Sequence, residues 1–143
     1  MSDEMKYAKI AYIIPFENAK DGIHEPALVI TQQSGKEVRF DVTLFFIGLN
    51  PGTIYNVSCS VSPADDKDDF FYYVTQKKFQ MDDVLNQGRP LPSAFNVPVI
   101  LPSPIASGQY KIEAKLSSEN SNKDEFKKAI SFIEIITTHS GDL

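Results

Sequence analysis

An acidic run is the part of this 143-residue chain whose side chains best fit a ligand site. Asp65, Asp66, Asp68 and Asp69 lie close together, interrupted by Lys67. A hard cation such as calcium binds several carboxylate oxygens, and loops at one end of a β-sandwich can supply them. The run lacks the Asp-x-Asp-x-Asp-Gly spacing of a helix–loop–helix calcium site, and a charged run is commonly a solvated turn. We expect a solvated hairpin turn and keep a calcium site as the alternative.

The residues that nucleophilic catalysis would need are few. His24 lies in a polar loop, His139 follows the last predicted strand, and Cys59 faces inward on an alternating strand. Such catalysis needs a base held within hydrogen-bonding reach of the nucleophile. A single cysteine also excludes an intramolecular disulfide and a multi-cysteine zinc centre. The seven glycines are scattered, so there is no glycine-rich phosphate loop. We expect no catalytic residue, no cofactor and no enzymatic activity.

The most unusual segment is aromatic, Phe70-Phe71-Tyr72-Tyr73. On a strand with one solvated face, Phe71 and Tyr73 would be exposed while Phe70 and Tyr72 face the core. Exposed aromatic rings commonly mark an interface, because they bury a large area at low entropic cost. Two interpretations remain: the connection at 86–93 covers these rings, or they contact a partner. A carbohydrate platform is a third, weakened because tryptophan is absent.

Period-two alternation of apolar and polar residues predicts the elements that position these side chains. The clearest case is Gln109 to Leu116, and Asn50-Pro51-Gly52 supplies a turn with the residues that turns require. Pro98 restricts its strand to an edge or a bulge. One helical turn is expected near 82–86. Strands are predicted at 6–14, 27–32, 38–48, 54–61, 70–81, 94–101, 109–116 and 128–137.

Closely spaced strands with turn-rich connections indicate an all-β fold, in which antiparallel sheets close into a sandwich of about seven to nine strands. A barrel gives a similar pattern, so the mode of closure stays open. The length suits one domain over residues 1–143, with a flexible tail at about 138–143.

The C-terminal part resembles a known kind of domain. Ser107-Gly108-Gln109-Tyr110 opens a strand, and a polar loop leads to a last strand containing Ile130-Ser131-Phe132-Ile133. This is similar to the closing strand pair of immunoglobulin-like sandwiches, where Gly-x-Tyr opens the penultimate strand. With the start Lys6-Tyr7-Ala8-Lys9, the chain resembles small bacterial immunoglobulin-like β-sandwich proteins of unknown function. The resemblance implies a fold and carries no catalytic residues.

Charge and targeting signals narrow the class of protein further. A net charge of −5 argues against binding to duplex nucleic acid, which needs a basic face. The acidic N-terminus does not fit a secretory signal, and the longest apolar run, 42–49, is far shorter than the roughly 20 residues that a membrane span needs. We expect a cytoplasmic protein with no membrane span.

The sequence therefore predicts a non-enzymatic immunoglobulin-like domain that acts through a protein surface. Its partner is another protein or a second copy of the chain, and Phe71 and Tyr73 are the candidate contact residues. The alternative is a module that binds calcium or carbohydrate through loops at one end of the sandwich, with the four aspartates of the acidic run as metal ligands.

Overall fold

The computed structural model describes residues 3–17, 25–65, 72–82, 91–122 and 124–138. Within these ranges the chain forms nine strands and one short 3-10 helix, and no helix there is long and apolar enough to cross a membrane. The elements are η1 (Asp3–Met5), β1 (Lys9–Glu17), β2 (Glu25–Pro26), β3 (Val29–Gln33), β4 (Val38–Leu49), β5 (Ile54–Pro63), β6 (Tyr73–Gln80), β7 (Leu91–Leu101), β8 (Gly108–Ser118) and β9 (Lys127–Thr138).

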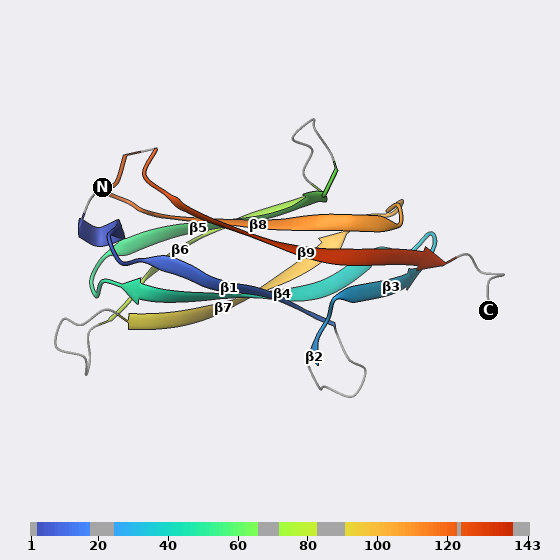
Figure 1. Ribbon diagram of the computed structural model, residues 1–143, viewed down its shortest axis with the longest axis horizontal. Helices are drawn as coiled ribbons and strands as arrows, with labels where there is room; N and C mark the ends of the chain where they lie inside the picture. Colours follow the sequence, from blue (N-terminus) through green and yellow to red (C-terminus); the bar gives the residue numbers. More distant parts are fainter. Residues whose placement is uncertain (1–2, 18–24, 66–71, 83–90, 123, 139–143) are drawn as a thin grey trace.

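The strands form two sheets that lie face to face as the two layers of a sandwich (Figure 1). One sheet has the order β2-β1-β4-β7, and the other has the order β3-β9-β8-β5-β6. All neighbouring strands are antiparallel except β3 and β9, which are parallel. The sheets are therefore separate layers, and the question of sandwich or barrel is settled in favour of the sandwich.

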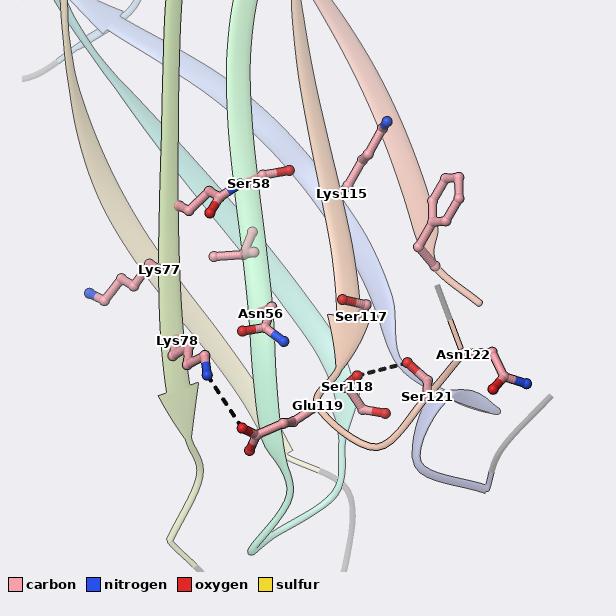
Figure 2. A pocket seen from close by; sticks show the side chains of 13 residues that line it. Asn56, Ser58, Lys77, Lys78, Lys115, Ser117, Ser118, Glu119, Ser121 and Asn122 are labelled. Carbon is pink, nitrogen blue, oxygen red and sulfur yellow. Dashed lines mark hydrogen bonds and ion pairs between the residues drawn. The ribbon is translucent and has the colours of Figure 1, made fainter. Parts of the chain in front are cut away.

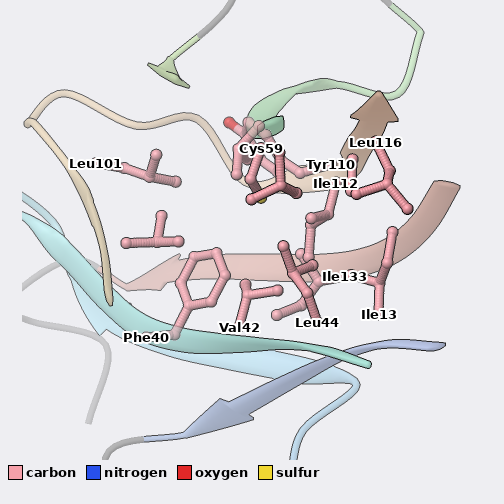
Figure 3. Packing of buried hydrophobic residues seen from close by; sticks show 14 of the residues in the cluster. Ile13, Phe40, Val42, Leu44, Cys59, Leu101, Tyr110, Ile112, Leu116 and Ile133 are labelled. Carbon is pink, nitrogen blue, oxygen red and sulfur yellow. The ribbon is translucent and has the colours of Figure 1, made fainter. Parts of the chain in front are cut away.

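The core lies between the layers and is filled by alternate residues of the long central strands (Figure 3). In β4, Phe40, Val42 and Leu44 point toward the other sheet and are almost completely buried. Ile112 and Leu116 of β8 meet them from the opposite layer. Each such side chain contributes about 1.5–3 kcal/mol when it leaves water. The apolar residues that alternate along the sequence are therefore the ones through which the two sheets pack.

Most predicted strands are found, and the all-β class is confirmed. The predicted strand 27–32 corresponds to β3, which begins two residues later, and the preceding strand β2 belongs to the other sheet. Ala27 still donates to the Pro15 carbonyl, whereas the Leu28 carbonyl accepts from Glu134 in the other layer. The chain crosses between sheets at this point, and a pattern of apolar residues cannot show which sheet a strand joins. The edge position expected from Pro98 is confirmed, since β7 ends its sheet.

Gly48 marks the closest backbone approach among the described glycines. Its φ is 71°, in the left-handed region that favours glycine. A Cβ atom built there would stand 1.9 Å from the carbonyl oxygen of Tyr7. Because glycine has no Cβ atom at this position, the segment before β1 can pass directly over β4.

We expect Gly48→Ala to lower the free energy of unfolding by about 2–4 kcal/mol, because strain and a backbone clash add together. Gly52→Ala is the matched control, since Gly52 has a φ of 80° but a Cβ atom placed on it would have no neighbouring atom within 4 Å. Strain alone should cost the control about 1 kcal/mol. Urea denaturation of both variants measures the difference, and equal losses would contradict the close approach.

Candidate functional site

The structure places Tyr73 differently from the sequence prediction. Tyr73 is half-buried and packs against the core, whereas Val74 is 54% exposed on the outer face. The cause is the register with β5, which pairs Tyr73 with the fully buried Val61, because paired antiparallel residues share a face. The expectation that Tyr73 faces solvent is wrong. Phe71 lies outside the described residues.

The acidic run is described only in part. Asp65 lies in a turn after β5 and is exposed, while Asp66, Asp68 and Asp69 lie outside the described residues. His24 and His139 lie outside them too. Among the described residues, no group of three or more histidine, cysteine, aspartate or glutamate side chains is placed to hold a metal ion. A calcium site at the acidic run stays a prediction.

Cys59 is a core residue, as its alternation predicts. Its side chain is 1% exposed, and burial raises the pKa of its thiol from 9.0 to about 11. A thiol reacts as the thiolate, which this environment disfavours at neutral pH. Cys59 also borders a crevice of about 300 Å³ between the edge strands β6 and β7, together with Tyr73 and Phe95. The crevice is an incompletely closed part of the core.

A polar trough runs along β5 on the outer face of the five-stranded sheet (Figure 2). We call it the β5 trough, and its floor consists of Asn56, Ser58 and Ser60. Each floor residue lies between one residue of β6 and one of β8, and Ser58 for example is paired with Gln76 and Lys115. The trough is hollow because the short side chains of Ser58 and Ser60 stand between longer ones on β6 and β8. Its larger part holds about 680 Å³.

The three lysines that line the β5 trough differ in whether their ammonium groups are free to bind a ligand. Lys78 forms an ion pair with Glu119 at 3.3 Å, so each neutralises the other. Lys77 points away from the trough, and its ammonium lies 4.4 Å from the centroid of the Phe95 ring (Figure 2). The Lys115 ammonium has no carboxylate partner among the described residues and lies 5.2 Å from the ring centroid of Phe126. Lys115 therefore gives the trough an available positive charge.

The outer face of the four-stranded sheet is apolar on its central strands, whereas the other outer face combines the polar trough with exposed Ile130 and Phe132 on β9. We call the outer face of the four-stranded sheet the apolar face. Tyr12 is 66% exposed, Ile47 is 48% exposed and Ile100 is 41% exposed, so rings and aliphatic groups meet solvent on three strands. The Tyr12 and Phe45 rings contact each other edge to face, with their centroids 6.4 Å apart. The outward residues of this face are Tyr12, Ile14, Phe16, Pro26, Thr43, Phe45, Ile47, Ala94, Asn96, Pro98 and Ile100, with Asp41 among them and the charged residues Lys9 and Arg39 toward its two ends.

The polar groups within the apolar face bond to one another. The Asn96 side chain donates to the Asp41 carboxylate at 3.3 Å, and the Thr43 hydroxyl donates to the Asn96 amide oxygen at 3.5 Å. Asp41 is only 9% exposed even though it points outward. A partner could therefore cover the centre of this face without removing water from unpaired polar groups, which is the main penalty of burial.

Sequence reasoning missed both surfaces for a definable reason. Asn56, Ser58 and Ser60 alternate outward in the sequence, and this row of short polar residues was a visible signal. The trough also depends on Gln76 and Lys115 standing beside Ser58, and the order of strands in the sheet determines that placement. The apolar face likewise becomes visible only when β1, β4 and β7 are known to be neighbours.

No known protein family matches the sequence, and no curated protein matches it. Solved structures with a similar fold exist. The C-terminal domain of Wzt is similar over 92% of this chain and 75% of that domain, with 13% identity and a TM-score of 0.53. The CARDB domain of the PF1109 protein from Pyrococcus furiosus, solved in complex with di-metal ions, is similar over 96% of this chain and 100% of that domain, with 12% identity and a TM-score of 0.44.

The fold is an immunoglobulin-like β-sandwich. A tyrosine near the start of β8 agrees with that class, because the Tyr110 hydroxyl donates to the Ala106 carbonyl at 2.6 Å, four residues upstream. Such a backward hydrogen bond is a hallmark of many immunoglobulin-like domains. Burial and the neighbouring Tyr72 raise the pKa of Tyr110 to about 12, so the hydroxyl keeps its proton as a donor at physiological pH.

The raised pKa of Cys59 makes stability depend on pH in the alkaline range. The thiol ionises near pH 9.0 in the unfolded chain and near 11 in the folded one, so its contribution is complete below pH 9.0 and lost as the pH rises toward 11. The stability deficit of Cys59→Ala relative to wild type should therefore shrink by about 2 kcal/mol as the pH rises from 8 to 11. Urea denaturation from pH 8 to 11 measures the difference, and a constant deficit would contradict burial of the thiol.

Proposed function

We propose that this protein is a non-enzymatic immunoglobulin-like domain that acts by binding protein, and that the apolar face is its binding surface. The observation that carries the proposal is the row of exposed apolar side chains across β1, β4 and β7, represented by Tyr12, Ile47 and Ile100. Contiguous exposed apolar patches of this kind on soluble domains commonly mark interaction sites. The buried thiol of Cys59 and its raised pKa support a role without catalysis.

A second copy of the same face is the partner that this geometry fits best. The three long strands β1, β4 and β7 lie about 4.8 Å apart and rise about 3.3 Å per residue, which gives them a flat footprint of about 500 Å². A standard stable interface buries about 800 Å² on each partner, and side-chain relief raises the accessible area above the flat footprint. Two sheets also pack face to face at about 10 Å, with their side chains interdigitating.

The chemistry of the face favours the same partner. The hydrogen bonds that join Asn96 to Asp41 and Thr43 satisfy its central polar groups internally. An isologous dimer places identical patches against each other, so both surfaces must tolerate a largely apolar partner. The apolar face meets this requirement, and the outer face around the β5 trough does not. The domain would then function as a dimer of 16.0 kDa chains.

The double variant Tyr12→Ser/Ile47→Ser should convert a dimer into a monomer of 16.0 kDa, because it removes two exposed apolar contacts from each copy. Sedimentation velocity at increasing concentration measures the mass, and the apparent Kd should rise at least about tenfold. Circular dichroism confirms that the fold remains.

The matched control is Val74→Ser/Ile130→Ser, which removes two residues of similar exposure from the other sheet. It should leave the dimer intact. A wild-type protein that stays monomeric at high concentration would overturn self-association through this face. Equal weakening by both double variants would overturn the assignment of the apolar face.

A further inference from the structure

We propose that the β5 trough is a second binding site, independent of the apolar face, and that its ligand is an acidic glycan chain. The trough lies on the opposite side of the sandwich, so a ligand there leaves the apolar face free. Its floor residues Asn56, Ser58 and Ser60 offer an amide and two hydroxyl groups in a line, and Lys115 stands beside them.

The shape of the trough fits a linear ligand. Residues two positions apart on one strand are about 6.6 Å apart, so three successive outward residues of β5 extend over about 13 Å. The main cleft of about 680 Å³ continues into a smaller one of about 160 Å³ that shares Ser58, Gln76 and Lys115 with it. A volume in this range fits a ligand of a few sugar rings.

Recognition in the trough must come from side chains. β5 is paired with β6 on one side and β8 on the other, so its backbone donors and acceptors are already used by the sheet. An extended peptide therefore cannot add to β5 as a new strand, which is the usual way in which sheets bind peptides. Hydroxyl and amide side chains such as Ser58, Gln76 and Asn56 can both donate to and accept from sugar hydroxyls.

The charge of the trough selects an anionic ligand. Both carboxylates that line the trough are engaged in ion pairs, Glu119 with Lys78 at 3.3 Å and Glu113 with Lys128 at 3.4 Å. Lys115 has no carboxylate partner among the described residues and is exposed, with the Phe126 ring as its contact. A charge-assisted hydrogen bond from an ammonium group to a carboxylate is roughly twice as strong as a neutral one. A uronic acid carboxylate beside Lys115 would receive that bond.

The same features disfavour a nucleic acid as the ligand. Proteins that bind single strands stack successive bases on successive aromatic side chains. The floor of the trough contains hydroxyl and amide groups, and Phe126 is the one aromatic residue among those lining it in the described part of the chain. One ring at one end can pack against the C–H face of a sugar, but it cannot support a row of bases.

The test is a titration followed by amide chemical shifts, using oligogalacturonate as an acidic probe, maltohexaose as a neutral one and inorganic phosphate as a small anion. Oligogalacturonate should shift the amides of residues 56–60 and 115–117, with a Kd of about 0.1–1 mM. Maltohexaose should bind at least about tenfold more weakly, because it cannot accept a charge-assisted bond from Lys115.

Two variants locate the site. Lys115→Gln should raise the Kd for oligogalacturonate about five- to tenfold, whereas Lys111→Gln should leave it unchanged. Lys111 is a matched control because it lies on the same strand and the same face, four residues away and outside the trough. Ser58→Leu should abolish binding by filling the floor, and thermal unfolding confirms that this variant folds.

Three outcomes would overturn the proposal of an acidic glycan site. No shift with millimolar oligogalacturonate would exclude an acidic glycan in the trough. Equal shifts with inorganic phosphate would reduce it to a small-anion site, and equal effects of Lys115→Gln and Lys111→Gln would show nonspecific attraction. Because Tyr12→Ser/Ile47→Ser leaves the trough unchanged, loss of dimerisation and loss of glycan binding can be told apart.

Discussion

Every strand in this protein has two faces, and the contact between the two sheets determines which residues take the inner one. Phe40, Val42 and Leu44 of β4 meet Ile112 and Leu116 of β8, and this packing fixes the register of the central strands. A shift of one residue would turn all of these side chains into water. The outer faces are set by the same choice, since whatever does not point inward must meet solvent or a partner.

The two outer faces then diverge because their residues differ. On β5 the outward positions hold short polar residues, and a polar trough results. On β1 and β4 the outward positions include Tyr12, Phe45 and Ile47, and an apolar surface results. Neither feature is needed to fill the core. Residues that the core does not require are the natural candidates for function, which is why both proposals rest on outward-facing side chains.

The fold was more predictable from the sequence than the candidate sites. Alternation in Gln109 to Leu116 identified β8 and the burial of its apolar residues, since strand periodicity is a local property. The face of Tyr73 was predicted wrongly because it depends on pairing with Val61 in another strand. The neighbours of Ser58 likewise come from β6 and β8. Surfaces assembled from several strands depend on the order of strands in the sheet, which local patterns do not contain.

The edge strand β7 carries two prolines, Pro92 and Pro98, and this has a consequence for how molecules of this protein can associate. A proline nitrogen has no hydrogen to donate, and in sheets proline is tolerated where that nitrogen faces away from the partner strand. The ladder with β4 continues through Pro98, so the missing donors lie along the free side of β7. A foreign strand therefore finds an interrupted template there. Growth of the four-stranded sheet by strand addition is therefore discouraged at this edge.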